Sequence, residues 1–186
     1  MDDRALARRC AEGDKEAFEE LYVKYSPRIY ALCLRYAGGP AEAEDLMQDS
    51  FIKIFRSIKK YRHAEGTPLS HWLTRVALNC CFDSYRKRKP FRTVSIEETG
   101  IQEARQEEPG YEQTLAVPQE ALLKLIDELP YKYRTIFQLF HMDGLSHKEI
   151  AKLLGIKENT SSSDLVRARA LLAAGINNYI KAHCDE

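Results

Sequence analysis

The stretch Asp143–Arg169, with the sequence DGLSHKEIAKLLGIKENTSSSDLVRAR, constrains the fold of this chain more than any other segment. Ser146 and Glu149 have the S-x-x-E spacing of a capping box, which begins a helix by satisfying free backbone N–H groups. The apolar residues that follow recur at three and four positions and give this helix one apolar face. They are Ile150, Leu153 and Leu154. The pattern predicts a short amphipathic helix.

A second helix follows this one after a tight turn. Gly155 fits the turn, because glycine adopts positive φ without steric cost. Lys157–Thr160 then opens the second helix, and the small Ala151 lies where the two helices must cross closely. This is the plan of a helix-turn-helix, whose second helix usually lies in the DNA major groove. The alternative is an ordinary αα-hairpin within an all-α domain.

Composition is that of a globular protein, with 30% charged and 44% hydrophobic residues. The apolar runs are far too short to cross a membrane, and the N-terminal MDDRALARRCAEGDKEAF lacks the apolar core of a signal peptide. We therefore expect a cytoplasmic protein with no membrane insertion of its own. At 186 residues, one or two domains are expected.

The cysteines and histidines show no metal-binding pattern. The five cysteines, an odd number, form no C-x-x-C pair, and the five histidines have no ligand spacing with them. Reduced thiols packed as small apolar groups are the expectation. We also find no G-x-S-x-G motif and no phosphate-binding glycine loop, so we expect no enzyme, no metal and no cofactor.

Charge is balanced overall but segregated along the chain. The 28 basic and 28 acidic residues cancel, whereas a protein that holds DNA alone is normally basic. Ser84–Arg92, SYRKRKPFR, is a basic cluster, and Glu97–Glu112 holds six glutamates against one arginine. This segregation suggests a protein that meets DNA as part of a larger assembly.

The apolar pattern predicts an all-α protein of two small helical domains, because period-two alternation is absent over any useful length. Residues 1–92 form the first predicted domain, with a long helix whose face carries Phe18, Leu21, Tyr22, Tyr25, Ile29, Cys33 and Tyr36. Ser70 is expected to cap a later helix of this domain. Residues 93–117 are poor in large apolar groups and predict a flexible linker. Residues 118–186 form the second domain, with an apolar stripe of Leu122, Leu123, Ile126 and Leu129 before Pro130.

Three segments together resemble a known family. They are Ala43–Ile58 (AEDLMQDSFIKIFRSI), Leu69–Lys89 (LSHWLTRVALNCCFDSYRKRK) and Asp127–Leu172, which contains the helix-turn-helix. In order and spacing they are similar to regions 2 and 4 of the extracytoplasmic-function sigma factors of the sigma-70 family. The resemblance implies a bacterial subunit that binds core RNA polymerase and directs it to promoters of a stress or envelope-signal regulon. It also implies an anti-sigma factor that holds the protein inactive.

The resemblance assigns the first segment to the docking of core RNA polymerase. Glu44, Asp45, Gln48 and Asp49 would form one polar, mostly acidic face of this helix, and such a face suits a basic partner. The expected polymerase contacts are Asp45, Leu46, Gln48, Asp49 and Phe51. Taken without the resemblance, the same face would be an ordinary solvated helix surface.

The second segment and the loop before it are assigned to the −10 element as single-stranded DNA. Melted DNA requires stacking, pockets for bases and cations for phosphates. The expected contacts are Tyr61, His63, Arg75, Asn79, Arg86, Lys87 and Arg88. Trp72 shares the apolar stripe of its helix and is interpreted as a core residue.

The third segment is assigned to the duplex −35 element, with one departure from the family pattern. Similar proteins commonly begin the recognition helix with Val and basic residues, whereas this chain has Ser161–Asp164, SSSD. Ser161 would forfeit an apolar plug, and Asp164 would place a negative charge near phosphates. The expected contacts are Lys157, Thr160, Ser161, Ser162, Ser163, Arg167 and Arg169.

Two rival functions remain open at this point. A helix-turn-helix regulator that is not a polymerase subunit would use residues 1–90 for dimerisation or ligand sensing, and would bind duplex DNA alone. A helical adaptor without a nucleic-acid role would leave the basic cluster and the helix-turn-helix unexplained.

Overall fold

The computed structural model describes residues 2–61, 68–88 and 117–183, and of residues 84–88 it describes the backbone only. Every regular element in these ranges is helical, as the apolar periodicity predicted. The chain divides into two compact units, Met1–Pro90 and Phe91–Glu186. His63 lies outside the described residues, as do the side chains of Arg86, Lys87 and Arg88.

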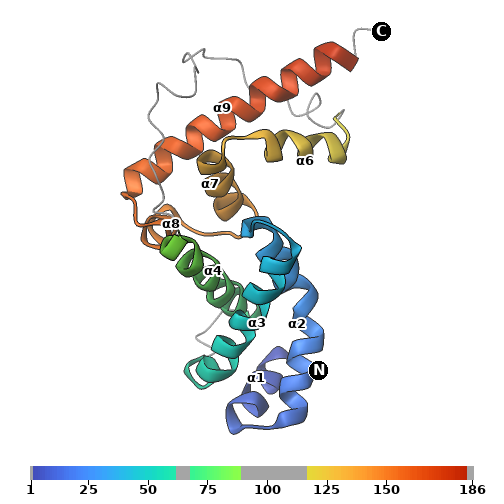
Figure 1. Cartoon of the computed structure of the whole chain (residues 1–186), viewed down its shortest axis with the longest axis vertical. Coiled ribbons are helices and arrows are strands. Elements are labelled where there is room, and N and C mark those ends of the chain that lie inside the picture. The colour runs from blue at the N-terminus through green and yellow to red at the C-terminus, as the bar shows by residue number, and fades with distance from the viewer. Residues whose placement is uncertain (1, 62–67, 89–116, 184–186) are drawn as a thin grey trace. The chain divides into compact units, whose positions relative to one another are not determined.

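The first unit is a helical bundle (Figure 1). Its elements are α1 (Asp3–Glu12), α2 (Lys15–Tyr36), α3 (Pro40–Ser57), the 3-10 turn η1 (Ile58–Lys60) and α4 (Leu69–Arg88). Helices α2, α3 and α4 pack against one another, and α1 covers α2 and η1. Leu21, Ile29, Ile54, Leu73 and Phe82 are almost completely buried where these helices meet. Burial of apolar area is the main stabilising term in such a bundle.

The long helix predicted from the stripe that begins at Phe18 is α2. Most of this stripe is buried, but Phe18 is half-buried and Tyr22 is exposed. The Phe18 and Phe55 ring centroids are 4.8 Å apart, and those of Tyr22 and Phe51 are 4.7 Å apart. Aromatic pairs at these distances attract one another. They attach the edge of α2 to α3.

Helix α1 was not predicted, and its caps explain why it forms. The Asp2 side chain accepts a hydrogen bond from the Arg4 N–H at 3.3 Å, and Gly13 ends the helix in the left-handed conformation with φ 92°. Leu6 and Cys10 are fully buried against the rest of the unit. A helix of only ten residues depends on such tertiary contacts.

The prediction that Ser70 caps a helix of this unit was wrong, because α4 already begins at Leu69.

The second unit contains α6 (Gln119–Glu128), α7 (Tyr131–His141), α8 (His147–Leu154) and the long α9 (Glu158–His183), against which the other three pack (Figure 1). Ile136, Leu139, Ile150 and Ala168 are fully buried in its core. Val117 is buried as well, although the sequence placed it at the end of the predicted linker.

Helix α6 differs from its prediction. None of its residues is buried, and Leu123 is 46% exposed. Of the predicted stripe only Leu129, the residue that ends the helix, is buried. Leu125 instead faces α9, where a Cβ added at Gly175 would lie 3.0 Å from its Cδ2. The missing side chain at Gly175 thus allows α6 to approach α9 closely.

Candidate nucleic-acid interface

The helix-turn-helix has the local geometry that its sequence predicted. The Ser146 Oγ accepts a hydrogen bond from the Glu149 N–H at 3.3 Å, and Glu149 Oε2 accepts one from the Ser146 N–H at 2.9 Å. This capping box begins α8. Gly155 ends α8 with φ 71°, and its N–H donates to the Ala151 carbonyl. The left-handed conformation of Gly155 turns the chain, so that α9 can begin three residues later, at Glu158.

Several polar side chains at the start of α9 face solvent. Lys157, Ser162 and Ser163 are exposed, and Thr160 is half-exposed. Val166 is the most exposed apolar residue here, at 63%. The Ser163 hydroxyl donates to the Thr160 carbonyl at 3.1 Å, which leaves its lone pairs available as acceptors. These residues form the accessible part of the expected recognition surface.

Ser161 was expected on the DNA surface, and this expectation was wrong. Its side chain is completely buried, and its Oγ lies 3.0 Å from His147 Nδ1 across the turn. Ser161 therefore takes the interior position that an apolar residue usually fills, with the imidazole satisfying its hydroxyl. A buried hydroxyl without a partner would be destabilising. Ser161 links α8 to α9, and its side chain is not accessible at the surface of the second unit.

Asp164 was expected to place a negative charge near phosphates, but the structure pairs this carboxylate with a cation inside the unit. Its side chain is 1% exposed, and Lys132 Nζ lies 2.9 Å from its Oδ1 and 2.8 Å from its Oδ2. Lys132 belongs to α7 and is itself only 7% exposed. The negative charge is thus neutralised inside the unit. Sequence spacing held no signal for this pair, because the partners are 32 positions apart.

The two arginines of α9 are both accessible but have different neighbours. Arg167 is 39% exposed, and its Nη1 lies 3.8 Å from Asp164 Oδ1. Arg169 is exposed, and its Nε donates to His141 Nε2 at 3.4 Å. Partial burial and the charge of Arg169 lower the pKa of His141. A neutral imidazole is the form that can accept this hydrogen bond.

The first unit presents the acidic surface that the sequence predicted on α3. Glu44, Asp45, Gln48 and Asp49 are all exposed. Within the described residues, none of the three carboxylates forms an ion pair with a basic side chain of this chain. Leu46 and Phe51, by contrast, are only 4% and 3% exposed. The expectation that these two contact a partner is corrected, because they belong to the core beneath the acidic surface.

The second polar surface of this unit lies on α4. Arg75 and Asn79 are exposed, and the Asn79 side-chain amide donates to the Arg75 carbonyl at 2.9 Å. Tyr61 is half-buried beside Trp72, with ring centroids 5.5 Å apart. Trp72 is also half-buried, so its assignment to the core is only partly right. Trp72, Arg75 and Asn79 follow one another at helical intervals, so they lie on neighbouring positions of one face of α4. The ring of Tyr61, in contact with Trp72, therefore lies beside the exposed Arg75 and Asn79.

Cys10, Cys33, Cys80 and Cys81 are buried free thiols. Burial raises the pKa of Cys10 to about 11, so its thiol stays protonated at neutral pH.

Within the described residues, the structure contains no group of three or more side chains able to hold a metal ion. No helix among them is long and apolar enough to cross a membrane.

Both units match known family models. Sigma-70 region 2 matches residues 5–91, and Sigma-70, region 4 matches residues 119–172. The ECF RNA polymerase sigma factor SigW of Bacillus subtilis is 33% identical over 173 residues, which cover 87% of this chain and 89% of that protein. This chain belongs to the sigma-70 family, in its extracytoplasmic-function (ECF) group. SigE of Mycolicibacterium smegmatis is 32% identical, covering 95% of this sigma factor and 67% of that one.

Solved structures share the fold of this sigma factor. The structure of CnrH in complex with the cytosolic domain of CnrY superposes with a TM-score of 0.54 at 23% identity, covering 95% of this chain and 97% of that chain. The sigma factor RpoE of Bartonella quintana, in a co-crystal with the anti-sigma factor NepR, gives a TM-score of 0.52 at 21% identity, covering 86% and 96%.

Proposed function

We propose that this protein is a sigma subunit of RNA polymerase that recognises promoters and initiates transcription. The observation that carries the proposal is the combination of two surfaces in one chain. The first unit presents the exposed carboxylates of α3, and the second presents the solvent-facing start of α9 in a helix-turn-helix. A regulator that binds DNA alone would have no use for the acidic surface.

The acidic surface of α3 is proposed to dock on a basic surface of core polymerase. We assign this contact to Asp45, Gln48 and Asp49, which are exposed, with Glu44 beside them. Complementary charges steer association and fix the register of an interface more than they add affinity. Leu46 and Phe51 support the surface from beneath.

The −10 element is proposed to bind along α4 and Tyr61 as a single strand. Arg75 and Asn79 are exposed there and can contact phosphates and base edges. The aromatic pair of Tyr61 and Trp72 offers stacking surface, which favours unpaired bases. Arg86, Lys87 and Arg88, from the basic end of α4, are assigned to phosphates on their charge alone.

The −35 element is proposed to bind as duplex DNA at the start of α9. Lys157, Thr160, Ser162, Ser163 and Arg167 remain assigned to it, because each is at least partly exposed. Arg169 also stays assigned to the −35 element, as a cation at the edge of this surface that donates a hydrogen bond to His141. Serine hydroxyls read bases weakly, so we expect Arg167 to contribute most to specificity.

The test is transcription in vitro by core polymerase with and without the protein, on a pool of promoter fragments. A sigma factor produces new transcripts with defined start sites only when the protein is added. A helix-turn-helix regulator would instead shift duplex DNA on its own and give no transcripts with core enzyme. Mapping the start sites also identifies the promoter sequence that the later experiments require.

Two further properties follow from this function as proposals. As a non-catalytic subunit of the polymerase, the protein would act in the cytoplasm. The family also leads us to expect an anti-sigma factor that occupies the polymerase-binding or DNA-binding surfaces. Affinity purification of the tagged protein before and after envelope stress would test for such a partner, which should be released on stress.

A further inference from the structure

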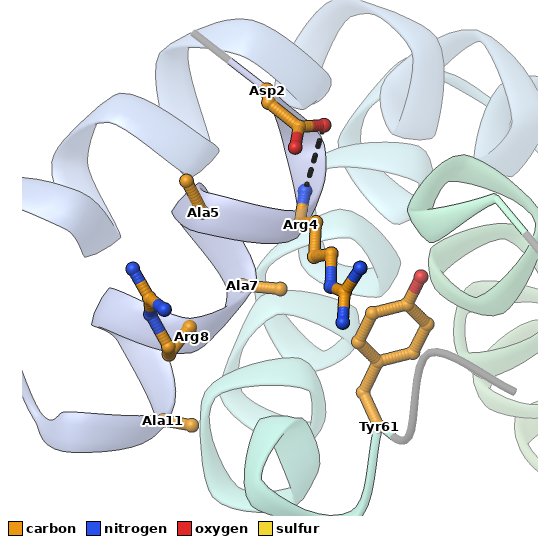
Figure 2. A pocket seen from close by; sticks show the side chains of 7 residues that line it. All are labelled: Asp2, Arg4, Ala5, Ala7, Arg8, Ala11 and Tyr61. Carbon is orange, nitrogen blue, oxygen red and sulfur yellow. Dashed lines mark hydrogen bonds between the residues drawn. The ribbon is translucent and has the colours of Figure 1, made fainter.

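The first unit has a hollow between α1 and Tyr61 (Figure 2). It has a volume of about 450 Å³ and is lined by two arginines, three alanines, an acidic residue and an aromatic residue. These are Asp2, Arg4, Ala5, Ala7, Arg8, Ala11 and Tyr61. The alanines keep the hollow open, because each projects only a methyl group. We call it the α1–Tyr61 hollow.

Arg4 and Arg8 are four residues apart, so they lie one turn apart along α1. The Arg4 guanidinium lies beside the ring of Tyr61, whereas Arg8 extends away from it at the other side of the hollow (Figure 2). Both side chains are exposed. Within the described residues, neither guanidinium forms an ion pair or a hydrogen bond, although Arg9 beside them bonds Asp14 at 2.7 Å.

This arrangement has no evident structural purpose. Like charges four apart destabilise a helix slightly, and Arg4 lies in the first turn of α1, at the positive N-terminus where a cation is unfavourable. Asp2 is the one carboxylate in the lining, and its Oδ1 is already bonded to the Arg4 backbone N–H. The lining therefore holds two guanidinium groups and one carboxylate, and this excess of positive charge favours an anionic ligand.

Tyr61 connects the hollow to the surface proposed for the −10 element. Its ring lines the hollow and also contacts Trp72 at the start of α4. Partial burial and the nearby carboxylate of Asp3 raise the pKa of Tyr61, so its side chain stays neutral at physiological pH. A ligand that continues from α4 past Tyr61 would meet Arg4 first and Arg8 next.

We propose that the α1–Tyr61 hollow binds the backbone of the melted promoter strand, with Arg4 and Arg8 on phosphates and Tyr61 packed against the nucleotide between them and α4. The inference rests on the proposed function and extends it to α1, which then belongs to the DNA-binding surface. Cations combined with an aromatic side chain are what proteins use to hold single strands. An acidic peptide would use the cations but has no need of the aromatic wall.

The test uses holoenzyme made from the full chain and core polymerase. The probe is a fluorescent forked fragment of a promoter found by start-site mapping, with its non-template strand single from the −10 element downstream. Each phosphate contact with a single strand contributes about 0.7 to the slope of log affinity against log salt. For Arg4→Gln/Arg8→Gln we expect the slope to fall by about 1.4 and the affinity at 0.1 M salt to fall about 25-fold.

Two matched variants serve as controls. Arg4→Lys/Arg8→Lys keeps both charges and should recover most of the affinity. Lys15→Gln/Arg28→Gln removes two exposed cations of α2 and should change neither the slope nor the affinity. Binding of an upstream duplex fragment that carries only the −35 element should be the same for all variants.

The outcomes separate this inference from the proposed function. If wild-type holoenzyme opens the promoter and Arg4→Gln/Arg8→Gln has the same affinity and salt slope, the hollow does not bind DNA. If the variant instead loses core polymerase, the hollow faces a protein, and the assignment to DNA is overturned. Failure of the wild-type chain to direct transcription would overturn the proposed function itself.

Discussion

Lys132 and Asp164 form an ion pair that is almost completely buried between α7 and α9, with Lys132 Nζ within 2.9 Å of both carboxylate oxygens. The pair fixes the start of α9 against α7, because each charge needs the other inside the unit. Asp164 also lies 3.8 Å from the Arg167 guanidinium. The carboxylate thus joins the core of the unit to an arginine of the proposed DNA surface.

Removing one partner of this pair should unfold the second unit more easily. Asp164→Ala leaves the ammonium of Lys132 buried without a counter-charge, so we expect the free energy of unfolding to fall by about 3–5 kcal/mol. Urea unfolding followed by circular dichroism measures this. Asp127→Ala, at an exposed position of α6, is the control and should change stability by less than about 0.5 kcal/mol. An equally small effect at Asp164 would show that the pair opens to solvent.

Exchange of the whole pair should be tolerated better. The double variant Lys132→Met/Asp164→Leu replaces two buried charges by apolar groups, which is often neutral or stabilising. We expect stability within about 1–2 kcal/mol of the wild type, well above that of Asp164→Ala. The difference between the two variants measures how much of the loss comes from the uncompensated charge. A double variant as unstable as Asp164→Ala would point to lost packing instead.

Arg167→Ala tests the proposed −35 surface. If the guanidinium reaches a base edge, binding of a duplex −35 fragment by holoenzyme should weaken by about 1–3 kcal/mol, and discrimination at one base pair should relax. Fluorescence anisotropy on matched and mutated fragments measures both. Lys181→Ala, near the far end of α9, is the control and should leave binding unchanged. Uniform weakening on all sequences would assign Arg167 to a phosphate.

The elements that sequence predicted well are those encoded by local signals. The capping box of Ser146 and Glu149, the turn at Gly155 and the apolar face of α2 all depend on residues a few positions apart. Such patterns are visible because helix geometry brings positions three and four apart onto one face. The acidic surface of α3 was predicted for the same reason, as was the absence of strands from the described elements.

The errors came from contacts between distant segments. Ser161 and Asp164 look like surface residues until His147 and Lys132 are placed beside them. Leu46 and Phe51 were expected at an interface, although their spacing equally fits the core of α3. Propensity and polarity cannot decide such cases, since tertiary partners determine whether a polar group is buried. The α1–Tyr61 hollow was missed because Arg4, Arg8 and Tyr61 come together only in the fold.

The bond between Arg169 and His141 should make the second unit sensitive to pH. The pKa of His141 is lowered in the folded state, so the unfolded chain binds more protons between that pKa and about 6.5. Stability should therefore be complete above about pH 6.5 and decrease as the pH falls through the folded pKa. Urea unfolding at several pH values should show a shallower decrease for His141→Gln than for wild type. Equal pH dependence would show that His141 contributes nothing.

The linker predicted at residues 93–117 can be tested by limited proteolysis. The segment up to residue 116 has too few large apolar groups to offset the entropy of ordering it. We expect the first cuts within residues 93–116 and two resistant helical fragments, identified by mass spectrometry. Val117 should remain with the second fragment, because it is buried there. Protection of the segment equal to that of the helices would contradict the prediction.

The acidic surface of α3 gives the test that best separates a polymerase subunit from an independent regulator. Asp45 and Asp49 are exposed, so reversing both to lysine should alter folding stability little. The reversal would nevertheless place positive charge against a basic partner, and mismatched like charges can cost several kcal/mol at an interface. Asp45→Lys/Asp49→Lys should therefore keep its helical circular dichroism and melting temperature, yet fail to co-elute with core polymerase or support transcription.

The control for this reversal must change net charge by the same amount elsewhere. Glu12→Lys/Glu19→Lys does so at two exposed positions of α1 and α2, which are not part of the acidic surface. We expect this variant to assemble with core polymerase and to direct transcription like the wild type. If the folded Asp45→Lys/Asp49→Lys protein assembled equally well, the α3 carboxylates would be merely solvated. Core polymerase would then have to dock on another surface of the protein.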